Sequence, residues 1–239
     1  MISDYEKHTF MNYWSRGLWD LRPEMNCKPL DITKYAERIF DCAFNQKNVA
    51  ISLDDLIDEM KPLFNGRPKF IRLNRRSPKD SLDGGYVKTP EQAIDVLTSS
   101  IRSMDDISYL LNYQEQIVLY SFDYWNIACD KEIRCFVKNN KLIGISQYEP
   151  SRYKTWPEED VEALTHSLSE LSIKIMENTP LESFIFDVFV FEGNPYFLEI
   201  NPWGLSDPCY FITYEAVEAG GFAYQKTVIE PLAKDRAEK

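Results

Sequence analysis

The chain has 239 residues, which is enough for one large domain or two small ones. Hydrophobic residues make up 44% of it and can fill a sizeable core, while the formal net charge is −11. Nucleic-acid binders usually hold phosphates with clustered cations, so this charge argues against direct nucleic-acid binding. No apolar run reaches membrane-spanning length, and no apolar signal core follows Met1, so we expect a cytoplasmic protein without a membrane segment.

Cysteine and histidine offer little for a catalytic or metal site. The five cysteines form no C-x-x-C pair, and there are only two histidines. We therefore expect reduced thiols and a chemistry carried by carboxylates, amides and cations.

The first predicted elements in chain order are helical, with short strands between them. Residues 35–44 are weakly amphipathic, and Ser52 with Asp55 resembles the capped start of a further helix. Residues 68–74 are typical of a strand, which delivers the cations of residues 75–80 to a loop. An N-cap threonine, a proline and a capping-box partner then predict one helix over residues 90–103.

Strands dominate the next part of the chain. Residues 116–122 contain the apolar run of a buried strand. Residues 132–138 and 142–147 flank Asn139-Asn140, and because asparagine tolerates positive φ, we predict a hairpin with a two-residue turn there.

A long helix is expected after this hairpin. Thr155 with Glu158 marks its start, and its apolar residues, from Val161 to Ile175, keep the 3,4 spacing of a core-facing helix. His166 lies within this pattern and is predicted to be a helix-surface residue.

A second hairpin is the most informative part of the sequence. Residues 183–191 and 195–201 are rich in β-forming residues, and the three-residue loop between them ends in an asparagine that can adopt the left-handed conformation. If residues 191 and 195 pair, paired positions sum to 386. Asp187 then lies opposite Glu199.

Asn201 shares the face of Asp187 and Glu199, because side chains alternate along a strand. Two carboxylates about 5 Å apart would repel by roughly 3 kcal/mol at an effective dielectric constant of 20, so a cation should lie between them. The oxygen-only donor set suits Mg²⁺ or Mn²⁺.

Two alternatives for this hairpin stay open. It could be a solvent-exposed edge hairpin, although the strand over residues 184–191 is apolar on both faces, as expected of a strand buried on both sides. It could also carry the paired carboxylates of a glycosidase, whose cross-strand spacing allows only the retaining geometry.

Cations provide the remaining candidates. Arg134 projects from a strand and needs a partner, which could be Glu132 on the same face or a phosphate held by two parallel hydrogen bonds. Arg72 and Lys79 could likewise face an anion, or lie on an ordinary surface. No P-loop or G-x-G-x-x-G motif occurs.

Three groups of residues resemble the cell division cycle protein 123 family. They are Arg72-Leu73-Asn74 with Ser77-Pro78-Lys79-Asp80, then residues 132–138 with 141–147, then Phe186-Asp187 with Glu199-Ile200-Asn201-Pro202-Trp203-Gly204. The resemblance covers roughly residues 66 to 212 and is weaker between 81 and 115.

The resemblance implies an α+β fold of the ATP-grasp type, with two lobes of antiparallel sheets and flanking helices that hold ATP and Mg²⁺ between them. Mn²⁺ is an alternative metal. From the residue patterns we expect a helical N-terminal region at residues 1–65 that packs on the ATP-grasp unit. The resemblance, which is slight in these residues, implies a first lobe at 66–122 and a second lobe at 123–239 that carries the metal-binding hairpin.

The resemblance also implies roles for individual residues. Asp187, Glu199 and Asn201 correspond to metal ligands, and Arg134 to a catalytic cation that faces the phosphate or acceptor. The nucleotide contacts would comprise these four residues together with Arg72, Ser77, Lys79, Val118, Leu119 and Tyr120. Among them, Arg72 and Lys79 would contact phosphates, and the main chain of residues 117–120 would bind adenine.

Three of these positions depart from the family pattern. Arg72 stands where lysine is common, Tyr120 where arginine is common, and Glu199 where aspartate is usual. The first and third changes keep the charge type, so we expect ATP and metal binding to survive.

The resemblance implies an ATP-binding assembly factor, or chaperone, for translation initiation factor two that engages its gamma subunit. The alternative is an ATP-dependent ligase that forms an acyl phosphate and transfers the acyl group to an amine or thiol. Whether the chain is an enzyme is left open by its residues.

Overall fold

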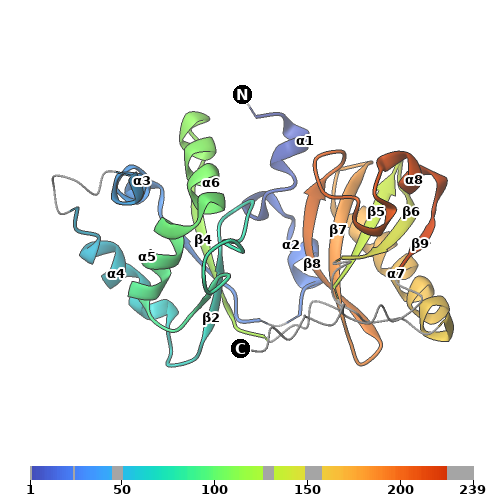
Figure 1. Cartoon of the computed structure of the whole chain (residues 1–239), viewed down its shortest axis with the longest axis horizontal. Coiled ribbons are helices and arrows are strands. Elements are labelled where there is room, and N and C mark those ends of the chain that lie inside the picture. Colours follow the sequence, from blue (N-terminus) through green and yellow to red (C-terminus); the bar gives the residue numbers. More distant parts are fainter. Residues whose placement is uncertain (1, 24, 45–50, 126–131, 149–157, 225–239) are drawn as a thin grey trace, which may run out of the picture. The chain divides into compact units, whose positions relative to one another are not determined.

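The computed structural model describes residues 2–23, 25–44, 51–125, 132–148 and 158–224, with backbone only at residues 158–160. The chain divides into two compact units (Figure 1). The first unit contains residues 1–13 and 24–126, and the second contains residues 14–23 and 127–239. Residues 1–65, which we expected to form one N-terminal region, thus contribute to both units.

The first unit is built on a four-stranded antiparallel sheet with the order β1-β4-β2-β3. Its strands are β1 (Lys28–Asp31), β2 (Lys69–Arg72), β3 (Tyr86–Val87) and β4 (Val118–Asp123). Its helices are α1 (Asp4–Lys7), α3 (Ala36–Phe44), α4 (Asp54–Met60), α5 (Pro90–Ser99) and α6 (Ile101–Asn112), with 3-10 turns at Met11–Tyr13, Thr33–Tyr35 and Lys61–Leu63. The described strand β4 confirms the buried strand expected over residues 116–122.

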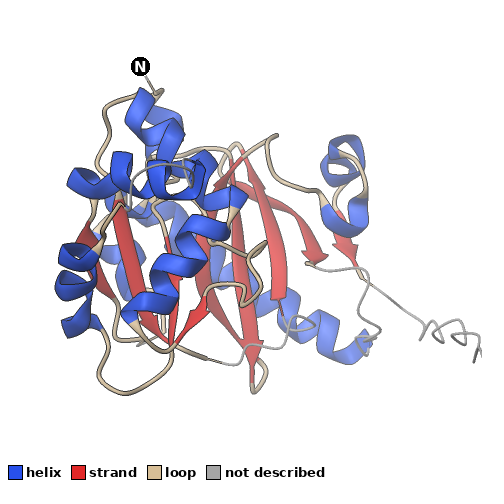
Figure 2. Ribbon diagram, turned by 60° about the vertical axis from the view of Figure 1, so that its left-hand side comes forward, coloured by secondary structure: helices blue, strands red, loops and turns tan. Residues whose placement is uncertain are grey.

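The hydrophobic core of the first unit lies between its sheet and helices α3–α6 (Figure 2). Ile71 and Leu119 point to this face and are almost fully buried with Ile39, Leu97 and Ile107 of the helices. Because neighbouring side chains on a strand point to opposite faces, Arg72, Val118 and Tyr120 share the other face of the sheet.

The predicted helix over residues 90–103 is wrong, because the structure contains two helices that meet at Ser100. The Ser100 backbone is extended, with ψ 118°, and its hydroxyl accepts a hydrogen bond from the Ser103 amide, which makes Ser100 the N-cap of α6. Ile101 is consequently 72% exposed instead of joining the apolar face of α5. The start of α4 also differs, since its N-cap residue is Leu53 and not Ser52.

The second unit is built on a five-stranded sheet with the order β8-β7-β5-β6-β9, in which only the β6–β9 pair is parallel. Its strands are β5 (Glu132–Lys138), β6 (Lys141–Gln147), β7 (Phe184–Phe191), β8 (Asn194–Pro202) and β9 (Gly221–Ala223). Its helices are α2 (Arg16–Asp20), α7 (Glu158–Asn178) and α8 (Tyr214–Ala219), with a 3-10 turn at Cys209–Phe211.

Several predictions for the second unit are confirmed. Asn139 and Asn140 have φ 50° and 57°, as the two-residue turn of the β5–β6 hairpin requires. Leu164 and Leu168 of α7 are buried. His166 is exposed, and its Nε2 lies 3.4 Å from Glu170 Oε1. Thr155, the predicted N-cap of this helix, lies outside the described residues.

The β7–β8 hairpin confirms the Asp187–Glu199 pair but corrects the turn. The turn residues are Glu192 and Gly193, with φ 51° and 79°, so the loop has two residues and Asn194 already pairs with Phe191. From the turn to Val188, paired positions therefore sum to 385. A bulge next to Asp187 raises the sum to 386, so the expected pair forms for a reason that the sequence argument did not contain.

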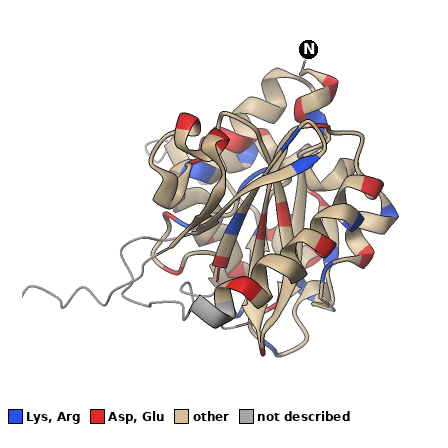
Figure 3. Cartoon of the chain, turned by 90° about the vertical axis from the view of Figure 1, so that its right-hand side faces the viewer, with Lys and Arg blue, Asp and Glu red and all other residues tan. Residues whose placement is uncertain are grey.

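Acidic and basic residues are interspersed over the ribbon in Figure 3, in keeping with a chain that has 38 acidic and 27 basic residues. None of the described helices combines the length and apolar character that a membrane crossing needs. Of the described cysteines, Cys27, Cys42, Cys135 and Cys209 are not in disulfide bonds, and Cys129 lies outside the described residues.

Candidate functional site

The polar centre of the second unit is a buried pair of Arg134 and Asp187. The register places these residues opposite each other on β5 and β7, and both are almost fully buried, with 5% and 2% exposed surface. Arg134 donates from Nε to Asp187 Oδ1 and from Nη2 to Asp187 Oδ2, both at 2.8 Å. This bidentate geometry is the strongest form of such a pair. Arg134 thus supplies a cation to Asp187, one of the two carboxylates between which a cation was expected.

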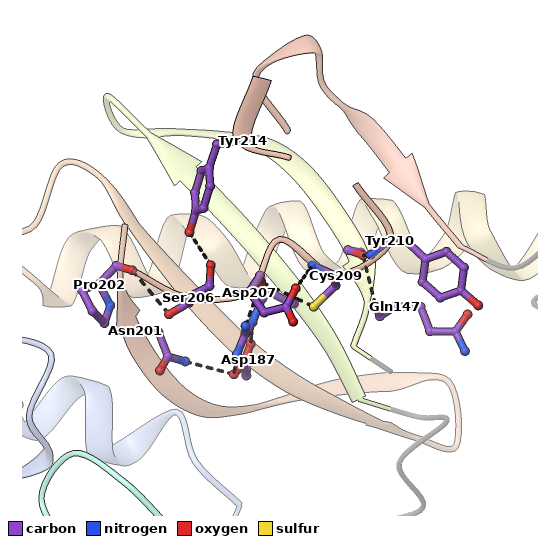
Figure 4. Close-up of polar contacts among 11 residues, drawn as sticks. Gln147, Asp187, Asn201, Pro202, Ser206, Asp207, Cys209, Tyr210 and Tyr214 are labelled. Carbon is purple, nitrogen blue, oxygen red and sulfur yellow. Dashed lines mark hydrogen bonds and ion pairs between the residues drawn. The ribbon is translucent and has the colours of Figure 1, made fainter. Parts of the chain in front are cut away.

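Asn201 and Glu199 complete this cluster from the edge strand β8. Asn201 Nδ2 donates to Asp187 Oδ2 at 3.0 Å, so its side-chain oxygen faces away from that carboxylate (Figure 4). Glu199 lies opposite Asp187 on the same face and is half-buried. The alternative of a solvent-exposed hairpin is wrong, because β7 is an interior strand and Asp187 lies in its buried part.

Arg134 also connects the sheet to the loop that follows β8. Its Nη1 donates to the main-chain oxygen of Asp207 at 2.9 Å, and its guanidinium carbon lies 4.7 Å from the ring centre of Tyr148. The Cys209 amide donates to Asp207 Oδ1, which shapes the same loop (Figure 4). These hydrogen bonds therefore join Arg134 to Asp187 and to this loop. None of them is to Glu132, the alternative partner.

The electrostatics of the cluster follow from its burial. Burial alone would lower the pKa of Arg134, but the charge and hydrogen bonds of Asp187 raise that pKa above its ordinary value. Burial raises the pKa of the Cys209 thiol to about 12 and that of Cys135 well above its usual range. Both thiols therefore stay protonated at neutral pH, which leaves the carboxylates as the anionic groups of the cluster.

The donor chemistry of the cluster fits a small divalent cation. Asp187 and Glu199 present carboxylate oxygens from two neighbouring strands, as Mg²⁺ or Mn²⁺ prefers. The Asn201 amide oxygen, which faces away from Asp187, would join them only after the amide group rotated. A cation here would share Asp187 with Arg134. Within the described ranges, no group of three or more His, Cys, Asp and Glu side chains is gathered for metal binding, so Asn201 is needed as the third donor.

The first unit holds the other predicted nucleotide contacts. Arg72 pairs with Tyr120 across β2 and β4, on the face of the sheet opposite the helices. Its Nη2 donates to the Arg75 carbonyl at 3.0 Å and its Nε to the Leu73 carbonyl at 3.4 Å. Arg72 is 7% exposed, so this cation is held by the main chain of the loop that begins after it.

The loop after Arg72 is braced by the start of α6. Asp80 accepts hydrogen bonds from the Ser100 hydroxyl at 2.6 Å and from the Arg102 amide at 3.1 Å, and Arg102 Nε donates to the Ser77 carbonyl at 3.0 Å. Ser77 is buried, whereas Lys79 is exposed. The structure therefore makes Asp80 and Arg102 the anchors of the segment that carries the predicted contacts.

The predicted adenine-binding strand is an interior strand. Val118 to Ser121 of β4 pair with β1, and Tyr120 to Asp123 pair with β2. The Val118 amide donates to Asn74 Oδ1 at 2.6 Å. Leu119 points to the helix-facing core, and burial raises the pKa of Tyr120. These bonds already occupy main-chain groups of β4, so they do not favour a main-chain contact between residues 117–120 and adenine. That contact stays a prediction.

A buried charge that the sequence reading passed over lies beside this loop. Asp106 of α6 is fully buried, and its Oδ2 accepts a hydrogen bond from the Arg75 amide at 3.4 Å. Arg75 Nη1 lies 3.3 Å from Asp106 Oδ1, but without hydrogen-bond geometry. Burial raises the pKa of Asp106 to about 6, and the nearby Arg75 only partly offsets this. Asp106 lies on the apolar face of α6 with Met104, Ile107 and Leu110, and this position in the sequence could have revealed the buried charge.

The sequence is similar to that of a known protein family. The sequence model of the D123 family matches residues 66–236. A translation initiation factor eIF2 assembly protein from Candida albicans is 30% identical over 199 residues, which are 74% of this chain and 56% of that protein. A protein of the same name from Xenopus laevis is 34% identical over 86 residues, 35% of this chain and 25% of its own length. The chain thus spans about half, or less, of these relatives.

A solved structure has a similar fold. Cdc123 from Schizosaccharomyces pombe aligns with a TM-score of 0.74 at 18% identity, over 95% of this chain and 97% of that chain. Together with the two antiparallel-rich sheets and their helices, this confirms the α+β fold class expected from the sequence. The ATP-grasp type stays a prediction.

Proposed function

Because the chain belongs to the D123 family, the cell division cycle protein 123 family, we propose that it binds ATP with Mg²⁺ and promotes assembly of translation initiation factor two. The names of its relatives support a role with this factor. We further propose that the gamma subunit is the partner and that the protein acts in the cytoplasm. The cluster of Asp187, Glu199 and Asn201 is the observation that supports the metal-dependent part of this proposal.

In this proposal the second unit supplies the metal ligands. Asp187, Glu199 and Asn201 would hold Mg²⁺, with Mn²⁺ as a substitute, and a bound ion would neutralise the charge of the ATP phosphates. Arg134 would keep Asp187 ionised and oriented. In the first unit, Arg72 and Lys79 would contact phosphates. Tyr120 is the cross-strand partner of Arg72, and the Ser77 carbonyl accepts a hydrogen bond from the Lys79 amide, so both residues lie beside these cations.

The ligase alternative assigns Arg134 a different task, which is to face the transferring phosphoryl group. Nε, Nη1 and Nη2 of Arg134 each donate to Asp187 or to the Asp207 carbonyl, so its position is already determined by the protein. This observation favours Arg134 as a residue that orients Asp187, and we keep the assembly factor as the proposed function.

Calorimetric titration of the whole chain with ATP, with and without Mg²⁺, tests nucleotide binding. We expect binding that Mg²⁺ strengthens and that Asp187→Asn or Glu199→Gln weakens. Glu199→Gln is included because Asp187→Asn removes the charge that balances buried Arg134. Glu215→Gln, an exposed acid on α8, serves as the matched control and should bind as the wild type does. Equal Mg·ATP affinity in wild type and Glu199→Gln would contradict the metal assignment.

Partner binding needs a separate experiment. Purified gamma subunit should form a complex with the chain that is detected by light scattering after size exclusion, and the isolated alpha subunit serves as the comparison. We expect a gamma complex at micromolar concentration in the presence of Mg·ATP. No complex with gamma, under conditions where Mg·ATP binds, would contradict the partner while leaving the nucleotide site intact.

A further inference from the structure

The segment over residues 14–23 packs on the second unit, although most of its sequence neighbours belong to the first. The Ser15 hydroxyl donates to the Asn178 carbonyl at 2.7 Å, at the end of α7. A β-carbon at Gly17 would lie 1.7 Å from Asn178 Oδ1, so a larger residue there would displace the Asn178 side chain. The Trp14 ring lies 5.3 Å from that of Phe197 on β8. These contacts bring the segment to the metal-site hairpin.

Arg22 contacts the hairpin at its bulge. Its Nη1 donates to the carbonyl oxygen of Leu198, and its guanidinium carbon lies 5.8 Å from the ring centres of both Trp14 and Trp19. The register pairs Phe197 with Val188 and Glu199 with Asp187, which makes Leu198 the extra residue. Arg22 therefore binds the carbonyl of Leu198, the extra residue that β8 has opposite β7 at the bulge.

The bulge decides which face of β8 carries the metal ligands. Between the turn and Val188, paired positions sum to 385. If that register continued, Leu198 would lie opposite Asp187, and Glu199 would point to the other face, because a shift of one residue inverts every side chain. The inserted residue returns Glu199 and Asn201 to the face of Asp187.

We propose that Arg22 is a positioning residue that holds the Leu198 bulge and thereby places Glu199 and Asn201 beside Asp187. The inference rests on the proposed function, because it takes these three residues as metal ligands. It concerns the second unit alone. It also gives residues 14–23, which lie outside the stretch matched by the family model, a role in the site.

Three variants of the whole chain test this proposal. Arg22→Met keeps the length of the side chain and its contact with the tryptophans but removes the donor. Arg22→Lys retains a donor and a charge, and provides a second test if the methionine variant folds poorly. Arg16→Met is the matched control, because Arg16 belongs to the same segment and its side chain is 93% exposed.

The first measurement is Mn²⁺ binding in the presence of ATP, followed by electron paramagnetic resonance of the free ion. We expect Arg22→Met to weaken Mn²⁺ binding by about 10-fold, within the range seen when groups behind metal ligands are removed. Arg22→Lys should recover part of this loss, Arg16→Met should match the wild type, and metal-free ATP affinity should stay unchanged. Wild-type Mn²⁺ affinity in both Arg22 variants would overturn the proposal.

The second measurement does not depend on bound metal. Amide hydrogen exchange should become faster at Glu199 and Asn201 in Arg22→Met, with no change at the Asn139-Asn140 hairpin. Unchanged exchange at both residues would overturn the role of Arg22 in the bulge. If the wild type and Glu199→Gln bind Mn²⁺ equally, the proposed function is wrong, and the exchange result still decides whether Arg22 sets the register.

Discussion

Both units contain a buried aspartate that faces an arginine, and the two pairs differ in geometry. In the second unit, Arg134 and Asp187 form two parallel hydrogen bonds of 2.8 Å. In the first unit, Arg75 Nη1 lies 3.3 Å from Asp106 Oδ1 without hydrogen-bond geometry, and Arg75 keeps 21% of its side chain exposed. Burial removes each carboxylate from water, but only Asp187 accepts guanidinium hydrogen bonds on both of its oxygens.

This difference shows which bonds hold the predicted site residues within each unit. The Arg134–Asp187 pair links two neighbouring strands, and through the Asp207 carbonyl it also links a loop, so the cluster around Asp187 is held by side-chain bonds. The loop over residues 75–80 is instead anchored through main-chain groups, with Asp80 on the start of α6 and Arg72 on the Arg75 carbonyl. We therefore expect mutations in the two units to act through different kinds of bonds.

The largest effect is expected from breaking the pair in the second unit. Arg134→Met leaves Asp187 as an unbalanced buried charge, which should lower the free energy of unfolding by about 3–5 kcal/mol. Urea denaturation measures this change. The double variant Arg134→Met with Asp187→Leu should recover most of the loss, because it removes both charges.

Lys138→Met provides the control for that experiment. Lys138 pairs with Glu218 on a partly exposed surface, where water weakens the interaction, so its loss should cost no more than about 1 kcal/mol. A similar cost for Arg134→Met and Lys138→Met would show that burial does not distinguish the Arg134 pair.

A smaller effect is expected from the pair in the first unit, and it depends on pH. Asp106 has a pKa of about 6 in the folded protein against an ordinary 3.8, so the folded state holds a proton that the unfolded chain has already lost. Stability should therefore fall as the pH rises from about 4 to 6. Two pKa units correspond to about 3 kcal/mol.

Asp106→Asn isolates this contribution, because an amide does not titrate. The free energy of unfolding of the wild type, relative to Asp106→Asn, should fall by about 3 kcal/mol between pH 4 and pH 7 in urea titrations. Other carboxylates, such as Asp80 and Asp123, have lowered pKa values and act below this window, so the subtraction removes them. A difference that is constant with pH would contradict an elevated Asp106 pKa.

The smallest effect concerns the two hairpin turns of the second unit. Both turns use two residues with positive φ, but one has Asn139-Asn140 and the other Glu192-Gly193. Glutamate adopts this conformation less readily than asparagine. Glu192→Asn should raise the free energy of unfolding by about 0.5 kcal/mol, measured by thermal and urea denaturation. Asn139→Glu should change it by a similar amount in the opposite direction.

Local patterns carried much of the prediction. The apolar run of β7 correctly indicated a strand buried on both faces, and Asn139-Asn140 correctly indicated a two-residue turn. The α5–α6 break was missed, because the hydroxyl of Ser100 both caps α6 and donates to Asp80, a residue 20 positions earlier. A pattern of apolar residues cannot contain that contact.

The candidate site was predicted in part. Asp187 was correctly placed opposite Glu199, but the assumed register was right only beyond the bulge at Leu198. The partner of Arg134 was not identified either, since the nearest acidic residue in the sequence is Glu132 and the one that it binds is Asp187. The roles of all these residues toward ATP and metal stay predictions.

The sequence by itself determined which strands are buried and where asparagine permits a turn, because burial and φ depend on residues that are neighbours in the chain. Only the tertiary structure decided that β5 lies beside β7, which gives Arg134 to Asp187, and that residues 14–23 pack on the second unit, which gives Arg22 to Leu198. These contacts join residues 53 and 176 positions apart. They depend on strand order and on the packing of whole elements, which no local pattern records.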